Sequence, residues 1–300
     1  MLIIAAPGQG SQKPGFLSPW LEDPSRTATL EAWSEVVGVD LVRHGTTSDA
    51  ETIRDTKIAQ PLIVAAGLLC GRMLQSHLPA GLAVGYAGHS VGEFTAAALA
   101  GVFSDEDALR LVALRGRAMA EASAQTPTGM SAVIGGTLEE LAPALQAKGL
   151  YPANVNGGGQ VVAAGPLDAL AQLRDDPPAG TRVIPLDVAG AFHTPFMSDA
   201  VETVREAASS VSTHDPLAPL YTNRNGTTVS SGAEMVDLLV GQISSPVRWD
   251  LCMESFARDG ATHLVELTPA GALVGLAKRA LKEVPATKLD LPDDVTAFSL

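Results

Sequence analysis

The residue type best placed for chemistry is a serine in a glycine-flanked turn. Ser90 is the centre of Gly88-His89-Ser90-Val91-Gly92, with Glu93 following, between an apolar run at 82–87 and an Ala-rich run at 95–100. The first run is typical of a buried strand and the second of a helix. In that setting G-x-S-x-G predicts a nucleophile elbow, a strained turn that aims the serine over a helix N-terminus, where developing negative charge is favoured. The alternative is a glycine-rich turn that merely packs a helix on a strand.

A histidine about a hundred positions later is the best candidate for a partner base. His193 directly precedes Thr194 and Pro195, which are helix N-cap and first-turn signals, and it falls where two predicted domains rejoin, a place where clefts form. His89 adjoins Ser90, but alternate residues of an elbow point apart. We expect the other four histidines to be surface or structural residues: His44, His77, His214 and His263.

A cation lies on an otherwise apolar helix face. Ser104 or Asp105 is expected to cap a helix that runs to about Gln125, and Arg115 falls on the same face as its apolar residues. An arginine there is costly unless it meets an anion, because a guanidinium stays charged. The anion could be a ligand, or one of the 33 acidic residues in a structural ion pair; spacing alone leaves both open.

Composition describes a soluble globular chain. It has 300 residues, 46% apolar and 18% charged, enough for one large domain and a smaller one. No uninterrupted apolar stretch approaches the length needed to span a bilayer, and Met1 leads directly into a strand-like run, so we expect a cytoplasmic protein. Cys70 and Cys252 lie in apolar segments and are expected to be reduced core thiols. A formal charge of −13 argues against nucleic-acid binding.

The remaining pattern alternates strands and helices. Gly8 to Gln12 forms a glycine-containing loop suited to close approach of a ligand, although it lacks the ending of a phosphate loop. Residues 38–57 are expected to be irregular, and the acidic C-terminal residues a loose tail. The predicted elements are a strand at 2–6, helices at 25–37 and 60–77, a helix from 194 to 211, a strand at 217–222, a helix at 232–243, a strand at 262–267 and a helix at 271–281.

A different order of predicted strands and helices between residues 128 and 187 indicates an inserted domain. Its predicted elements are strand 130–135, helix 138–148, strands 151–155 and 161–164, helix 166–174 and strand 181–186. The order βαββαβ is that of a ferredoxin-like unit. The predicted fold class is therefore α/β: a large α/β-hydrolase-like domain with a mainly parallel sheet, residues 1–127 and 188–300, and a small ferredoxin-like domain, residues 128–187.

Five segments, in order, carry a resemblance to one family. They are Gly8–Gln12, Gly88–Glu93, Leu114–Gly116, Ala191–His193, and Gln242 through Trp249. Together the chain resembles the malonyl-CoA:acyl carrier protein transacylases of type II fatty-acid synthesis or of polyketide pathways, over essentially its whole length. The departures are mild: valine replaces the commoner leucine after the serine, and Leu267–Gly271 replaces a glycine-rich segment.

The resemblance implies roles for the catalytic groups. Ser90 would be the acylated nucleophile and His193 the base. The backbone N–H groups of Gln9 and Val91 would form the oxyanion hole. Arg115 would bind the malonyl carboxylate as a two-pronged pair.

The resemblance also implies which residues contact the substrate or orient the base. The main chain of Gln242 would orient the histidine, so that no acidic third residue is needed. Phe192 matches the version of its triplet associated with malonyl, and Met119, on the face of Arg115, completes the expected substrate-binding set.

The implied reaction moves malonyl from malonyl-CoA to the phosphopantetheine thiol of an acyl carrier protein through a malonyl-serine, without a metal or other cofactor. The expected partners are malonyl-CoA and the carrier protein, with no nucleic acid and no membrane, and the expected state is a monomer. Candidate basic residues for carrier docking are Lys278, Arg279, Lys282 and Arg72.

Two other functions use the same residues. A serine hydrolase or thioesterase would share the elbow, but normally places its histidine late in the chain, and His193 comes too early for that. A catalytically inactive module that only docks the carrier protein is the non-enzymatic alternative.

Overall fold

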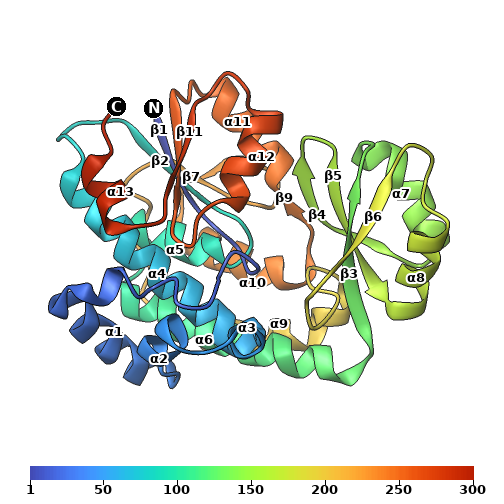
Figure 1. Cartoon of the computed structure of the whole chain (residues 1–300), viewed down its shortest axis with the longest axis horizontal. Coiled ribbons are helices and arrows are strands. Elements are labelled where there is room, and N and C mark those ends of the chain that lie inside the picture. The colour runs from blue at the N-terminus through green and yellow to red at the C-terminus, as the bar shows by residue number, and fades with distance from the viewer.

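The computed structural model describes residues 1–300 as an α/β protein with two mixed sheets (Figure 1). The first sheet has the order β11-β10-β1-β2-β7-β8, and its neighbours are parallel except for β7 and β8. Every residue of β1 is buried, because a parallel strand covered on both faces is apolar throughout. The strands are β1 (Leu2–Ala6), β2 (Val84–Gly88), β7 (Leu220–Tyr221), β8 (Thr228–Val229), β10 (His263–Leu267) and β11 (Ala286–Leu289).

The second sheet has the order β6-β3-β5-β4-β9 and is antiparallel except for its last pair. Helices α7 (Leu138–Ala147) and α8 (Leu167–Asp175) lie beside it on the outer side of the molecule (Figure 1). Its last strand is unexpected, because β9 belongs to a segment far downstream of the other four. The strands are β3 (Thr128–Ile134), β4 (Tyr151–Gly157), β5 (Gln160–Pro166), β6 (Arg182–Leu186) and β9 (Val247–Arg248).

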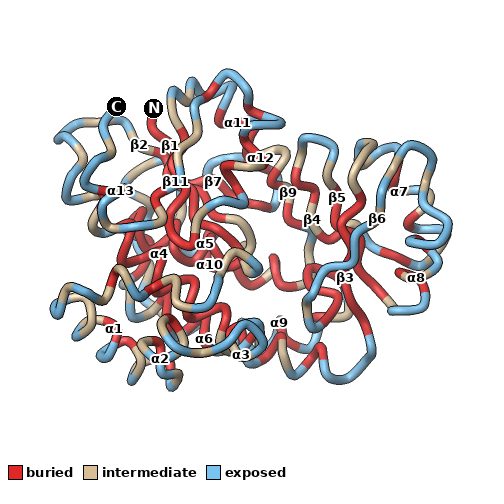
Figure 2. The backbone as a smooth tube through the Cα atoms, in the orientation of Figure 1, coloured by how far each residue is buried: buried red, intermediate tan, exposed pale blue.

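The helices α4 (Thr56–His77), α5 (Gly92–Leu99) and α6 (Asp105–Gln125) pack together and form much of the largest core cluster, of 59 buried residues. Figure 2 shows their backbones buried beside the first sheet. By length and average composition α4 could cross a membrane, although polar and charged residues interrupt its apolar sequence as expected, and 72% of its most apolar window is buried inside the protein. Within this fold α4 is a core helix.

The other helices are α1 (Pro24–Val37), α2 (Leu41–Thr46), α3 (Ala50–Arg54), α9 (Ser198–Ala208), α10 (Gly232–Gly241), α11 (Trp249–Arg258), α12 (Ala272–Ala280) and α13 (Pro292–Ala297), with short 3-10 turns η1 (Trp20–Glu22), η2 (Pro195–Met197) and η3 (Gln242–Ser244). Two expectations are wrong. The stretch before α4 contains α2 and α3, whose first turns are capped by Asp40 and Asp49. The C-terminal residues are not a loose tail, because β11 pairs with β10 and α13 follows it. Neither α11 nor β8 was predicted.

The carboxyl ends of β1, β2 and β7 lie side by side in the first sheet, since these strands are parallel neighbours. Three loops therefore begin at the same edge: the loop after Ala6, the turn at Ser90 and the segment after Tyr221. Ligands in such sheets bind beyond the carboxyl ends of the strands. This edge is where the predicted site residues meet.

Candidate active site

The turn between β2 and α5 holds Ser90 in a left-handed backbone conformation, with φ of +53°. A non-glycine residue there is strained and needs support from its surroundings. The backbone N–H of Ser90 donates to Oδ1 of Asn223 at 2.8 Å, and Nδ2 of Asn223 donates to the carbonyl of Gly88 at 2.7 Å. A Cβ at Gly88 would overlap the backbone of Gly92, and a Cβ at Gly92 would overlap the carbonyl of Ala6. The glycines of the motif are thus required by the close packing of strand, turn and helix.

His193 lies within hydrogen-bond distance of Ser90. Its Nε2 lies 2.7 Å from the Ser90 Oγ, and its Nδ1 lies 2.8 Å from the carbonyl oxygen of Gln242. A carbonyl can only accept, so Nδ1 carries the proton and Nε2 is left as the acceptor for the serine hydroxyl. Burial, and then the nearby charge of Arg115, lowers the pKa of His193 to about 3, which keeps the ring neutral.

Arg115 is fully buried and points at the same serine. Its Nη1 donates to Gln60 Oε1 and its Nη2 to Gln242 Oε1, both at 2.7 Å, and Nη2 also lies 3.4 Å from Ser90 Oγ. Its Nε has no hydrogen-bond partner, and no carboxylate lies within ion-pair distance. Burial lowers its pKa to about 10, so it remains charged at neutral pH. The structural ion pair considered from the sequence is therefore not formed.

Gln242 connects these three residues. Its main-chain carbonyl accepts from His193, its Oε1 accepts from Arg115, and its Nε2 donates to the Ser90 carbonyl at 3.1 Å and to Glu93. The resemblance implied only the main-chain contact. The side-chain contacts, which link the nucleophile to the cation, were not predicted.

Two backbone N–H groups beside the cavity at Ser90 have no acceptor within the protein. The N–H groups of Gln9 and Val91 donate to no other group of the protein, and both residues line the cavity at Ser90. Val91 is the N-cap of α5 and Gln9 lies in the loop after β1, and free N–H groups of this kind suit a developing oxyanion. Gln9 is held by its side chain, whose Nε2 donates to Thr56 Oγ1 at 3.3 Å.

The cavity over the serine is small, about 80 Å³. Met119 and Phe192 line it together with Ser90 and His193, and both are nearly inaccessible to solvent. Gln60, which the sequence interpretation missed, lines it as well and orients Arg115. A wider groove of about 330 Å³ continues from it past His89 to Arg279 on α12.

The basic residues expected at a docking surface differ in their environment. Arg72 forms an ion pair with Asp105 at 2.6 Å and donates to the Ala98 carbonyl, so it serves the packing of α4. Lys278, Arg279 and Lys282 are exposed and form no ion pair.

Several residues that the structure places at the site were given no role from the sequence. Asn223 supports the elbow, and Glu93 was quoted in the motif without a role. His89, by contrast, was expected to point away from Ser90, and its Nε2 indeed lies 2.8 Å from Asn156 Oδ1 and not against the serine hydroxyl. Asn223 lies two residues beyond the carboxyl end of β7, the strand that pairs with β2, and that position is the signal that could have found it.

The two cysteines are buried and unpaired, as expected, and burial raises the pKa of the Cys70 thiol to about 12. No group of three or more histidine, cysteine or acidic side chains is arranged to hold a metal ion.

Comparisons with known proteins show the family of the chain. Residues 6–296 match the family described as the acyl transferase domain. The chain is 50% identical over 296 residues to the malonyl CoA-acyl carrier protein transacylase of Mycobacterium tuberculosis, covering 98% of each, and 32% identical over 298 residues to that of Escherichia coli K12, covering 97% of this chain and 96% of the relative.

Solved structures give the same result. The crystal structure of MCAT from Mycobacterium tuberculosis matches with a TM-score of 0.95 at 50% identity, covering 98% of each chain. A type II PKS acyl-carrier protein in complex with its malonyl-transacylase contains a chain that matches with a TM-score of 0.92 at 30% identity, covering 98% of this chain and 97% of that one. An acyl transferase domain over nearly the whole chain, and this level of identity to curated relatives, place the protein in the malonyl CoA-acyl carrier protein transacylase family.

Proposed function

We propose that the protein transfers a malonyl group from malonyl-CoA to the phosphopantetheine thiol of an acyl carrier protein. One observation carries this proposal: the Ser90 Oγ lies 2.7 Å from a neutral imidazole nitrogen and 3.4 Å from a buried guanidinium that has no carboxylate partner. The first contact suits acyl transfer. The second suits an acyl group that brings its own carboxylate.

In the first half-reaction, the Ser90 hydroxyl gives its proton to His193 Nε2 as its oxygen attacks the thioester carbonyl carbon. The N–H groups of Gln9 and Val91 bind the resulting oxyanion. As the tetrahedral intermediate collapses, the carbon–sulfur bond breaks and His193 returns the proton to the departing thiol. The second half-reaction runs the same steps with the phosphopantetheine thiol as the nucleophile and Ser90 as the leaving group.

Arg115 does more than bind the carboxylate. Its positive charge is one cause of the low pKa of His193, so an anion paired with Arg115 cancels that charge and makes the imidazole a better base. A malonyl group supplies this anion and an acetyl group does not. Selectivity and catalysis are therefore coupled through one side chain.

The finer description of the architecture is also a proposal. The first sheet and its helices correspond to an α/β-hydrolase-like domain, residues 1–127 and 188–300. Residues 128–187 correspond to a ferredoxin-like domain, and the strand order β6-β3-β5-β4 supports this. The cytoplasmic location, the monomeric state and the need for no cofactor stay predictions.

The test is to incubate the protein with malonyl-CoA and a phosphopantetheinylated carrier protein and to follow both by intact mass. We expect a malonyl adduct on Ser90 and then malonyl on the carrier, with neither in Ser90→Ala. Free malonate as the main product would instead identify a hydrolase, and no adduct at all would identify an inactive docking module.

A further inference from the structure

A buried acid next to the active site has no part in the mechanism above. Glu93 lies in the first turn of α5, three positions after the nucleophile, and is only 1% exposed. Its Oε1 accepts from the backbone N–H of Asn223 at 2.7 Å, and its Oε2 accepts from Gln242 Nε2. It forms no ion pair. Burying an acid in this way is costly, so the contacts it makes need an explanation.

The hydrogen-bond pattern defines the form of Glu93 that fits. Both of its oxygens face N–H groups, which can only donate. An ionised carboxylate accepts at both positions. A glutamine amide would turn its NH2 group toward one of these donors and lose that bond, and a protonated carboxyl group is a weaker acceptor for both than the carboxylate.

Glu93 thereby fixes which way round the Gln242 amide lies. With Nε2 held by Glu93 and by the Ser90 carbonyl, Oε1 must face Arg115. If the amide were reversed, its NH2 group would face the guanidinium, donor against donor. Glu93 also binds Asn223, which in turn holds the Ser90 N–H.

We propose that ionised Glu93 is a positioning residue for malonyl recognition, which acts through Gln242 to keep the Arg115 guanidinium aimed at the cavity beside Ser90. This rests on the proposed function. Glu93 does not touch the acyl group, so it is not itself a catalytic residue.

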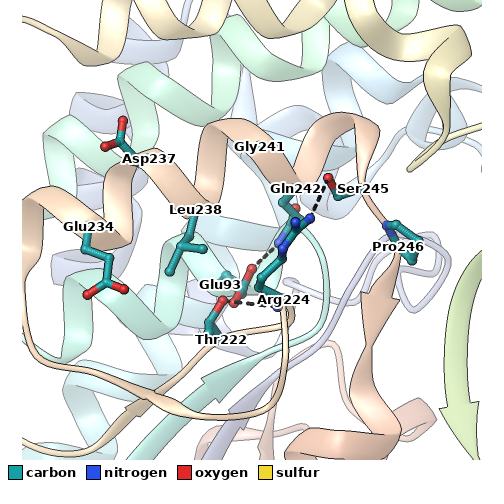
Figure 3. A pocket seen from close by; sticks show the side chains of 10 residues that line it. All are labelled: Glu93, Thr222, Arg224, Glu234, Asp237, Leu238, Gly241, Gln242, Ser245 and Pro246. Atoms are coloured by element: carbon teal, nitrogen blue, oxygen red, sulfur yellow. Dashed lines mark hydrogen bonds between the residues drawn. The ribbon is translucent and has the colours of Figure 1, made fainter.

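A second cavity, which neither Ser90 nor His193 lines, borders Glu93. It has a volume of about 330 Å³, and Glu93, Thr222 and Gln242 line it (Figure 3). Figure 3 also shows Glu234 and Asp237 of α10 standing apart from Glu93. The charged or titratable groups around Glu93 are Arg115 on α6, Cys252 on α11, His193 beyond Gln242, and Arg224, Glu234 and Asp237 around the cavity.

Burial raises the pKa of Glu93 to about 7, against the opposing effects of its hydrogen bonds and of Arg115. Below that pH the carboxylate takes a proton and its hold on Gln242 weakens. Acetyl transfer does not use Arg115 as a binding group, so malonyl transfer should decline more steeply than acetyl transfer as the pH falls from 8.5 to 6.

The experiment measures the rates of Ser90 acylation by malonyl-CoA and by acetyl-CoA between pH 6 and 8.5, by intact mass, in the wild type and in Glu93→Gln. We expect the malonyl-to-acetyl ratio to fall at least threefold on acidification in the wild type. In Glu93→Gln we expect it to be at least tenfold lower at pH 8.5 and nearly independent of pH. Glu234→Gln removes an exposed carboxylate from the same cavity and should behave as the wild type does.

Two further variants separate positioning from a loss of folding. Glu93→Asp keeps the charge and should restore part of the ratio, whereas Gln242→Ala should lower it so far that adding Glu93→Gln has no further effect. A wild-type ratio that does not change with pH, or equal losses of both acyl groups in Glu93→Gln, would overturn the inference. The wild-type measurement decides even where Glu93→Gln fails to fold. A wild type that forms no malonyl adduct would instead contradict the proposed function.

Discussion

Replacing Arg115 by alanine tests the selectivity argument most directly. The guanidinium is fully buried, and its two Nη atoms are held by Gln60 and Gln242 at 2.7 Å. In the variant a malonyl carboxylate would enter this site without a counter-charge, while an acetyl group would no longer leave a buried cation unpaired.

The magnitude follows from the burial. Removing one partner of a buried, hydrogen-bonded charge pair costs about 3 to 5 kcal/mol. At about 1.4 kcal/mol for each factor of ten, malonyl transfer should lose roughly 100- to 5000-fold in kcat/KM. Acetyl transfer should be unchanged or faster, because the positive charge that lowers the pKa of His193 is gone as well.

The assay mixes malonyl-CoA and acetyl-CoA with the carrier protein and measures both acyl products by mass in the same sample. Using the ratio removes any effect of a reduced folded fraction, which matters because the variant leaves two buried glutamine oxygens without a donor. Arg117→Ala, on the same helix but exposed, is the matched control. Arg115→Lys tests whether a positive charge without the planar guanidinium is enough for malonyl selectivity. A malonyl-to-acetyl ratio in Arg115→Ala within twofold of the wild type would refute the reasoning.

Three further outcomes are expected. His193→Ala should slow Ser90 acylation by roughly 100- to 10,000-fold in single-turnover kinetics with the fold retained; a loss below tenfold would remove it from the mechanism. Gly92→Ala should lower the free energy of unfolding by about 3 kcal/mol or more in urea titrations, because its Cβ would overlap the Ala6 carbonyl, whereas Gly275→Ala, whose Cβ has space, should not. The pKa of His193 is about 3 in the folded protein and 6.5 in the unfolded chain. Below pH 6.5 the unfolded chain therefore takes up a proton that the folded protein does not, and the free energy of unfolding falls until the pH reaches about 3. Between pH 7 and 4.5 the wild type should lose about 2 to 3 kcal/mol more than His193→Gln, and equal losses would contradict this.

The parts of the structure that could be predicted are those that short-range sequence patterns determine. The elbow follows from a strand, two glycines and a helix within 20 residues, and the elements between 128 and 187 from clear changes in periodicity. The position of Arg115 on a buried face follows from helical spacing. These features depend on neighbours along the chain.

The parts that were missed depend on partners elsewhere. Helices α2 and α3 have six and five residues, too few to show a period, and only their aspartate caps mark them. Strand β11 is defined by its parallel pairing with β10, which the sequence alone does not show. Helix α13 begins with Pro292, but this helix-start signal was interpreted as part of an irregular tail. Glu93 and the side chain of Gln242 meet over 149 positions, a contact that no pattern in one sequence contains.

The edge strand β9 limits how this protein can be recombined with its relatives. A chimera that exchanges only residues 128–187 would leave β4 paired with a foreign β9, since Asn154 and Val155 lie opposite Val247 and Arg248. Two residues separate strand β9 from the end of η3, which contains Gln242, so a mismatch there would disturb the hydrogen bond between His193 and Gln242. A functional graft must therefore carry the stretch 242–258 together with the inserted strands, and breakpoints are better tolerated beyond α11.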